Sequence, residues 1–195
     1  ANPRGRRIKN PYEHFDYFRN LAHDPDILTP LIPLLGPDIR FYGGKMNMKS
    51  AGYGAPVEWH QDYAFYPHTN DDIVAIGICI DDMAPENGPL MVFPGPHKGP
   101  VFDHRVDGVF AGAMLPQDNG LNPDDAVQLT GPAGSISIHH GRIVHGSALN
   151  TSDRARRILF YEMMAADAFP IMGSMTKWAG IEDYNTRMLC GEPTL

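Results

Sequence analysis

Apolar residues follow two different spacings along the chain. Over residues 12–35 they recur at roughly helical intervals, as with Phe15 and Phe18, and prolines interrupt the pattern. From residue 39 onward they form short runs, alternating or continuous, between clusters of Gly, Pro, Asn and Asp. The pattern predicts an N-terminal helical flank over 12–35 and a β-rich core over 39–165.

The β-rich part divides into many short predicted strands with no helical pattern between them. Residues 73–80 are apolar on both faces, which is typical of a central, covered strand. Gly43-Gly44 and residues 150–153 are among the predicted turns. Such a series favours an antiparallel sandwich or barrel, and we predict a double-stranded β-helix (a cupin-like jelly roll) with flanking N-terminal helices. The predicted strands cover 40–42, 45–48, 57–62, 73–80, 90–93, 127–129, 135–139, 142–145 and 157–164.

One short motif carries strong chemical information, Trp59-His60-Gln61-Asp62. Side chains alternate between faces in a strand, so His60 and Asp62 are expected to point the same way and Gln61 the other. A second imidazole from a distant strand would complete a facial triad of two histidines and one carboxylate, which is typical of non-haem Fe(II) oxygenases. Such a triad leaves three coordination positions open for other ligands.

The chain contains nine histidines from which the third ligand must come. Those in the helical flank and in predicted turns are poor candidates, which leaves His139, His140 and His145 near the end of a late strand. An apolar run leads to His145, and Gly146-Ser147 follows it as a small-residue turn. This context favours His145. His140 stays open, because a bulge would change the face on which it lies.

Arg156 follows His145 by eleven residues and begins the last predicted strand. A turn at 150–153 would fold this strand back beside the strand of His145 and bring Arg156 into the same cavity. A buried guanidinium requires an anion, and a carboxylate is its natural bidentate partner. Ser147 could offer a hydroxyl to the same carboxylate.

Together these motifs resemble the phytanoyl-CoA dioxygenase family of Fe(II)/2-oxoglutarate-dependent oxygenases. The likeness extends over roughly Gly36 to Ala166, most of the chain. A lone His-x-Asp would be weak support, but the combination occurs in the family's order and at about its spacing. The residues that carry it are Trp59-His60-Gln61-Asp62, Asn87-Gly88, the Pro-Gly-Pro-His-Lys-Gly segment at 94–99, His145-Gly146-Ser147 and Arg156.

The resemblance implies a role for each matching residue. His60, Asp62 and His145 match the iron ligands, which are also the catalytic residues. Arg156 matches the residue that binds the distal carboxylate of 2-oxoglutarate, with Ser147 beside it. The implied cofactors and cosubstrates are Fe(II), 2-oxoglutarate and O₂, and the implied reaction is hydroxylation of an unactivated C–H bond with release of succinate and CO₂.

Two further positions compare less closely with the family. Asn47 resembles an asparagine that some members use on the cosubstrate. Ile78 stands where some members place a Trp against 2-oxoglutarate. Related halogenases carry a small residue at the carboxylate position, so the presence of Asp62 favours hydroxylation over halide transfer.

Substrate contacts are harder to predict, because selectivity in such folds depends on loops. Tyr63 and Tyr66 follow the metal motif, and Lys49 and Tyr53 lie in or beside the glycine-rich loop before it. These four residues are the candidate substrate contacts. The segment 102–125 is long and acidic, which indicates a lid, and the expected substrate is a small or medium-sized metabolite.

Composition and charge narrow the choice of partners. The net charge of −7 argues against nucleic-acid binding. The basic cluster Arg4, Arg6, Arg7 and Lys9 is interpreted as a solvated terminal arm. The two cysteines make no disulfide framework, and no stretch approaches the length of a membrane span or has the form of a signal peptide. We therefore expect a cytoplasmic protein of 195 residues in one oxygenase domain, 1–195, in which 166–195 form a C-terminal extension.

Two other functions fit parts of this pattern. The first is a cupin-like metalloenzyme that uses the same triad without 2-oxoglutarate, and therefore does not need Arg156. The second is a non-catalytic metal-binding barrel. The sequence carries no signal for an oligomeric state.

Overall fold

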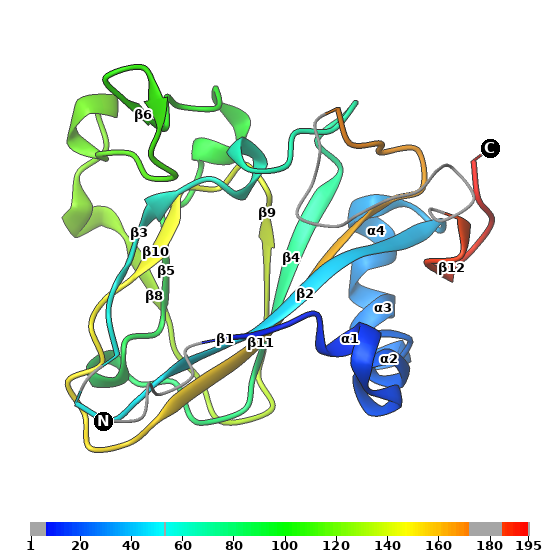
Figure 1. Ribbon diagram of the computed structural model, residues 1–195, viewed down its shortest axis with the longest axis horizontal. Helices are drawn as coiled ribbons and strands as arrows, with labels where there is room; N and C mark the ends of the chain where they lie inside the picture. Colours follow the sequence, from blue (N-terminus) through cyan, green and yellow to red (C-terminus); the bar gives the residue numbers. More distant parts are fainter. Residues whose placement is uncertain (1–6, 53, 172–184, 195) are drawn as a thin grey trace.

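Two antiparallel sheets face each other in the computed structural model, which describes residues 7–52, 54–171 and 185–194 (Figure 1). The larger sheet has the order β1-β2-β11-β4-β9, and β12 also pairs with β2. The smaller sheet has the order β3-β10-β5-β8, and β6 and β7 form a separate hairpin. The strands are β1 (Arg7–Lys9), β2 (Ile39–Lys49), β3 (Val57–His60), β4 (Ile73–Cys79), β5 (Leu90–Val92), β6 (Arg105–Val106), β7 (Val109–Phe110), β8 (Val127–Leu129), β9 (Ile136–His140), β10 (His145–Ser147), β11 (Arg156–Ala165) and β12 (Met188–Cys190).

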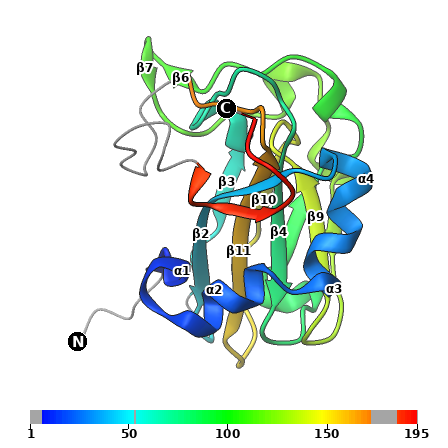
Figure 2. The same ribbon diagram turned by 90° about the vertical axis from the view of Figure 1, so that its right-hand side faces the viewer.

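The helical segment lies against the outer face of the larger sheet (Figure 2). Prolines stand in the first turn of several of its elements, where a missing N–H costs no hydrogen bond, so they divide the segment into short pieces. The helices are α1 (Pro11–His14), α2 (Asp16–Ala22), α3 (Pro25–Leu28) and α4 (Ile32–Leu35), with the 3-10 turn η1 (Thr29–Leu31) before α4. Other single 3-10 turns are η2 (Asp62–Ala64), η3 (Pro85–Asn87), η4 (Pro96–Lys98), η5 (Gln117–Asn119) and η6 (Pro123–Asp125).

Side chains alternate along β11, so one face of the larger sheet packs against the helices and the other faces the smaller sheet. Leu159, Tyr161 and Met163 are fully buried against the helices, and the Tyr161 hydroxyl donates to the Phe18 carbonyl at 2.7 Å. Arg156, Ile158 and Phe160 point toward the smaller sheet. The outer face therefore holds the main core, and the inner face is left for a cavity.

The predicted mainly-β character is confirmed, but the turn predicted at Gly43-Gly44 is wrong. β2 runs without a break through both glycines. A Cβ on Gly43 would lie 2.9 Å from the Glu162 carboxylate, and one on Gly44 would lie 3.0 Å from the Tyr161 ring. The ladder with β11 also shifts register between Glu162 and Met163. These glycines serve close strand packing beside a bulge rather than chain reversal.

The predicted pairing of the His145 strand with the Arg156 strand is also wrong. β10 begins only at His145 and pairs with β3 and β5 in the smaller sheet. β11 pairs with β2 and β4 in the larger sheet. The connection between β10 and β11 therefore crosses from one sheet to the other instead of closing a hairpin. The central strand predicted at 73–80 is confirmed, because β4 lies between β11 and β9.

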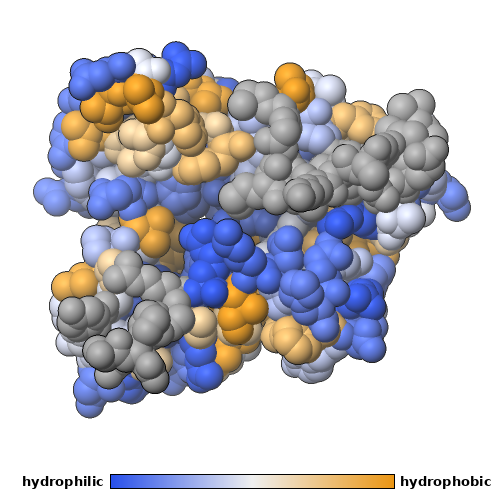
Figure 3. All heavy atoms as spheres, in the orientation of Figure 1, coloured by the Kyte–Doolittle hydropathy of each residue, from blue (hydrophilic) through white to orange (hydrophobic). Residues whose placement is uncertain are grey.

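The segment predicted as a lid forms the β6–β7 hairpin and the turns η5 and η6. One of its buried side chains, Met114, packs with Phe93 and Val144, which anchors the segment to the smaller sheet. Val106, Val109 and Phe110 leave an exposed apolar area on the hairpin, at the upper left of Figure 3. Within the described residues, no helix is both long and apolar enough to cross a membrane.

The two-faced sheet predicts that core and cavity can be perturbed separately. We expect Leu159→Ala to lower the free energy of unfolding by about 2–5 kcal/mol, because a fully buried side chain leaves a void among the helices. The matched control is Leu149→Ala, since Leu149 is 47% exposed and its truncation should cost less than about 0.5 kcal/mol. Denaturant unfolding of both variants measures the difference, and equal losses would contradict this assignment of the core.

Candidate active site

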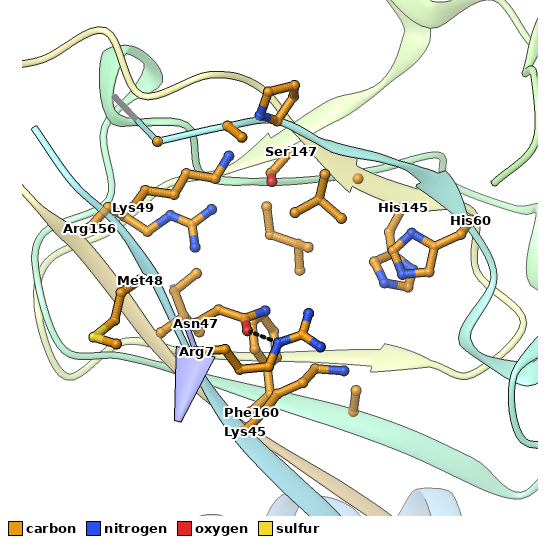
Figure 4. Close-up of a pocket in the computed structure, with 18 of the residues that line it drawn as sticks. Arg7, Lys45, Asn47, Met48, Lys49, His60, His145, Ser147, Arg156 and Phe160 are labelled. Carbon is orange, nitrogen blue, oxygen red and sulfur yellow. Dashed lines mark hydrogen bonds between the residues drawn. The ribbon is translucent and has the colours of Figure 1, made fainter. Parts of the chain in front are cut away.

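A cavity of about 900 Å³ lies between the two sheets (Figure 4). The larger sheet contributes charged and polar side chains from β1, β2 and β11, and the smaller sheet contributes His60, His145 and Ser147. Apolar side chains such as Leu90, Ile158 and Phe160 separate these groups. The cavity is large enough for a small-molecule ligand and carries polar groups at several points of its wall.

His60, Asp62 and His145 meet at one end of this cavity. Adjacent antiparallel strands bring the two imidazoles together, because His60 on β3 pairs directly with His145 on β10. Gln61 keeps an extended backbone, with φ −115° and ψ 127°, so Asp62 continues the strand alternation although it begins η2. The Asp62 carboxylate lies 3.6 Å from Nε2 of His60 and 3.9 Å from Nε2 of His145. One ligand atom from each residue lies within 4.8 Å of the others.

Backbone carbonyls orient both imidazoles. Nδ1 of His60 lies 2.7 Å from the Glu58 carbonyl, and Nδ1 of His145 lies 3.1 Å from the Ile143 carbonyl. A carbonyl can only accept, so each Nδ1 carries the proton and each Nε2 keeps its lone pair for the cavity. Burial lowers the pKa of His145 to about 3, which keeps its ring neutral as metal binding requires.

Asp62 is buried yet ionised. Burial by itself would raise its pKa, but the Lys45 charge, with smaller contributions from His145 and His60, outweighs burial and holds the pKa of Asp62 well below its usual range. Lys45 is in turn paired with Glu162, at 2.9 Å between Nζ and Oε1. Two imidazoles and one carboxylate with free lone pairs in one corner can hold a divalent transition metal.

His139 is a third histidine beside this cluster, and the sequence pattern did not single it out. Its Nε2 lies 3.9 Å from the Asp62 carboxylate, and its ring centroid lies 4.8 Å from that of His145. Its Nδ1 is buried without a hydrogen-bond partner among the described residues, so no backbone carbonyl orients it as one orients His145. Burial lowers its pKa to about 4. This contrast favours His145 as ligand and His139 as a neighbour of Asp62.

The signal that could have found His139 is strand parity. β9 places His139 opposite Ala75 of β4, on the inner face of the larger sheet. His140 points elsewhere and lies near His97, with ring centroids 5.6 Å apart. In a regular strand His139 and His140 lie on opposite faces, so the alternation that turns His140 away from the cavity also turns His139 toward it.

Gln61 supports the motif from behind. Its fully buried side-chain amide donates to the Arg142 carbonyl at 2.7 Å, and its Oε1 accepts from the Phe102 N–H at 2.7 Å. Its backbone N–H donates to Nε2 of His104 at 2.9 Å. These bonds hold the segment between the two candidate ligands against the loop that follows η4.

Arg156 and Ser147 lie at the other end of the cavity. Nε and Nη2 of Arg156 both donate to the Gly88 carbonyl, at 3.0 and 2.5 Å, and no carboxylate pairs with this guanidinium within the described ranges. The Ser147 hydroxyl is buried without a hydrogen-bond partner in the same part of the chain. A buried cation without a carboxylate partner and a buried hydroxyl without a hydrogen-bond partner suit an anionic ligand.

Lys49 lies beside Arg156 on the neighbouring strand, and the two residues form a register pair. Its ammonium donates to the Ala148 carbonyl. Burial, with a smaller contribution from the Arg156 charge, lowers the pKa of Lys49 to about 7. This end of the cavity therefore carries two cationic groups, of which one can lose its proton near neutral pH.

Arg7 is exposed, as the interpretation of its cluster as a solvated arm expects, but it also lines the cavity, which that interpretation did not predict. β1 pairs with β2 and places Arg7 opposite Asn47, whose Oδ1 accepts from Nε of Arg7 at 3.0 Å. Asn47 therefore lies in the cavity wall, as expected of a cosubstrate contact, but its amide oxygen is already engaged. The rest of the basic cluster up to Arg6 lies outside the described residues.

The other predicted contacts do not line this cavity within the described ranges. The Tyr63 hydroxyl donates to the His68 carbonyl at 2.8 Å, and Tyr66 is buried against Tyr42. Contact of these tyrosines with a substrate stays a prediction. Tyr53 lies outside the described residues. Ile78 packs with the helix-side core, so it faces away from the cavity.

The sequence matches a known family model and several named proteins. The family model described as phytanoyl-CoA dioxygenase matches residues 5–158. A protein of Stutzerimonas stutzeri named as a probable alpha-ketoglutarate-dependent hypophosphite dioxygenase is 41% identical over 194 residues, covering 97% of this chain and 66% of the relative. The L-proline trans-4-hydroxylase of Streptomyces griseoviridis is 37% identical over 146 residues, covering 65% of this chain and 54% of the relative. The chain thus spans between half and two thirds of the length of these relatives.

Solved structures resemble the fold. The apo form of the non-heme monooxygenase ThoJ has a TM-score of 0.74 at 22% identity, covering 92% of this chain and 63% of that structure. The epimerase SnoN, described in complex with Fe³⁺, alpha-ketoglutarate and a nogalamycin compound, has a TM-score of 0.69 at 25% identity, covering 83% and 64%.

The geometry of the histidine cluster makes a prediction about metal affinity. His145→Ala should abolish tight binding of a divalent transition metal, because one of three ligands is lost. His139→Gln should keep the metal and weaken its binding by about 10–100-fold, as expected for a group that acts through a ligand. Titration of the purified variants with Fe(II) under argon, or with Ni(II) as a redox-stable probe, measures both. Equal loss of binding in the two variants would contradict the distinction between them.

Proposed function

The chain belongs to the phytanoyl-CoA dioxygenase family, and on that premise we propose that it is a non-haem Fe(II)- and 2-oxoglutarate-dependent oxygenase that hydroxylates a small or medium-sized metabolite. One observation carries the proposal. A cluster of two histidines and one carboxylate shares a cavity with Arg156, a buried guanidinium that no carboxylate neutralises in the described part of the chain.

The donor set fits Fe(II). His60 and His145 each turn an Nε2 lone pair toward the cavity, because a backbone carbonyl holds the proton on Nδ1, and Asp62 supplies one negative charge. Nε2 of His60 lies 3.6 Å from one oxygen of Asp62 and Nε2 of His145 lies 3.9 Å from the other, and one ligand atom from each residue lies within 4.8 Å of the others. Small side-chain shifts would bring all three to about 2.1 Å from one ion. We therefore propose these three residues as the iron ligands.

The far end fits the distal carboxylate of 2-oxoglutarate. Arg156 is buried and cationic, although burial lowers its pKa to about 10. The Ser147 hydroxyl, which lacks a partner among the described residues, would donate to the same carboxylate. The proposed anchors are Arg156 and Ser147, with Asn47 on the wall between them and the histidines.

The protein's own part in the reaction is to bind, orient and exclude water. When bound, Fe(II) and 2-oxoglutarate would supply the oxidising power for hydroxylation with O₂, releasing succinate and CO₂. Leu90, Ile158 and Phe160 surround the middle of the cavity with apolar surface, which limits access of water to the reacting atoms. The Glu58 and Ile143 carbonyls hold the two imidazoles in place.

The fold supports the proposal at the level of architecture. We propose that the two facing sheets form the double-stranded β-helix expected from the strand pattern, with the chain acting as one oxygenase unit. The smaller sheet would carry the two histidine ligands and Ser147, and the larger sheet would carry Arg156. An enzyme of the alternative kind, a metalloenzyme without 2-oxoglutarate, would have no use for an unneutralised guanidinium at 3% exposure.

Anaerobic titration tests the proposal. Adding 2-oxoglutarate to the Fe(II)-loaded protein should produce the visible charge-transfer band of a chelated 2-oxo acid. Absence of the band at saturating Fe(II) would exclude a 2-oxoglutarate-dependent activity. Succinate release would then be assayed with hypophosphite and L-proline, the compounds for which the two relatives are named.

Replacement of the anchor separates cosubstrate binding from iron binding. Arg156→Gln should raise the 2-oxoglutarate concentration needed for the band by about 10–150-fold, the effect of losing a charged hydrogen-bond donor. Iron affinity should stay within about twofold of the wild type, because Arg156 is not a ligand. Arg154→Gln is the matched control, since Arg154 is 56% exposed at its side chain and pairs with Glu86 outside the cavity. A normal 2-oxoglutarate titration in Arg156→Gln would refute the anchor.

Lys49 predicts a pH dependence of cosubstrate binding. Its pKa of about 7 means that its positive charge is present below pH 7 and lost above it. A dicarboxylate binds the charged form more tightly, so the affinity for 2-oxoglutarate should fall as pH rises from 6 to 8.5. Lys49→Met should bind with the affinity of the high-pH wild type at every pH. Dissociation constants measured across this range decide the matter, and an unchanged slope in Lys49→Met would contradict it.

A further inference from the structure

The cavity wall carries more positive charge than the proposed iron and 2-oxoglutarate need. Its cationic residues are Arg7, Lys45, Lys49 and Arg156, and its carboxylate is Asp62. Glu162 neutralises Lys45 at 2.9 Å. A divalent metal and a dicarboxylate cancel each other, and Arg156 balances Asp62. Arg7 is then left over, together with whatever fraction of Lys49 is charged.

The cations fall into two groups with different neighbours. The Arg156 charge acts on Lys49, whereas the Arg7 charge acts on Lys45, whose own charge acts on Asp62. In Figure 4 the Arg7 guanidinium and the Lys45 ammonium both point toward the side where His60 and His145 lie, and Arg156 and Lys49 lie at the opposite side. Arg7 therefore belongs to the metal end of the cavity rather than to the cosubstrate end.

The Arg7 side chain is held in a form that suits an oxyanion. Asn47 accepts from its Nε at 3.0 Å, and this bond uses one edge of the guanidinium. Within the described residues no carboxylate pairs with Arg7, so the two terminal nitrogens keep donors for a ligand. A guanidinium binds two oxygens of one carboxylate or phosphorus oxyanion in a planar fork.

From this placement we propose that the primary substrate is a small monoanion, and that Arg7 binds its oxyanion group and determines this specificity. The inference rests on the proposed function, because the charge balance assumes bound iron and 2-oxoglutarate. With Lys49 unprotonated, a single negative charge makes the filled cavity neutral. Arg7 is exposed, so water would solvate its charge beside a neutral substrate, whereas an oxyanion gains a bidentate ion pair with its guanidinium.

Binding of simple anions to the loaded protein tests the proposal. The probes are hypophosphite, formate and acetate, and the neutral controls of similar shape are formamide and acetamide. Each is titrated under argon into protein loaded with Fe(II) and 2-oxoglutarate, and the change of the visible band gives an apparent dissociation constant. The wild type should bind the anions at least about tenfold more tightly than the amides.

Variants then assign the effect to Arg7. Arg7→Gln should weaken anion binding by about 10–100-fold and leave the 2-oxoglutarate titration unchanged. Arg7→Lys should recover part of the affinity, because it keeps the charge and loses the fork. The matched control is Lys9→Gln, which removes the same charge from the same strand at a residue that does not line the cavity. It should behave as the wild type.

The outcomes separate this inference from the function on which it rests. If the wild type forms no band with 2-oxoglutarate, the proposed function fails. If the band forms but the amides bind as tightly as the anions, the monoanion specificity is overturned. If Arg7→Gln binds the anions as the wild type does, or Lys9→Gln loses as much affinity, the assignment to Arg7 is overturned and the oxygenase proposal stands.

Discussion

A buried carboxylate that must stay ionised governs the arrangement of the polar residues in this protein. Asp62 is only 4% exposed, and an isolated negative charge at such a place would be neutralised by a raised pKa. Lys45 and the imidazoles around Asp62 prevent this. Lys45 is compatible with burial because Glu162 pairs with it. Keeping this one charge therefore involves partners on four strands, β2, β3, β10 and β11.

The larger sheet makes this possible because its two faces do different work. Its outer face presents Leu159, Tyr161 and Met163 to the helices and supplies the main hydrophobic core. Because the outer face supplies the core, the inner face can hold charged groups whose burial costs free energy. Arg156, at 3% exposure, is such a group. A sheet that packed its core on the inner face would leave no room for a cavity between the layers.

Several features of the site were readable in the sequence, although one argument failed. Alternation predicted that His60 and Asp62 share a face, and Gln61 keeps the extended backbone that this requires. The predicted hairpin between His145 and Arg156 does not exist, because their strands belong to different sheets. Both residues nevertheless line one cavity, since the two sheets face each other across it. The site therefore assembles although the strands of His145 and Arg156 do not pair with each other.

Local patterns in the sequence determined the β-rich core, the central strand at β4, the His-x-Asp half of the candidate metal site and the family resemblance. These depend on the period of side chains within one strand, which neighbouring residues fully specify. Strand parity could have put His139 on the inner face, but only the tertiary structure decided that it lies 3.9 Å from the Asp62 carboxylate. The tertiary structure also decided that Arg7 lines the cavity wall and that Gly43-Gly44 stays within a strand. Each of these depends on a partner far away in sequence, on β4, β2 or β11. The three candidate ligand positions follow from spacing and local context in the sequence, whereas the charges around them depend on which strands lie side by side.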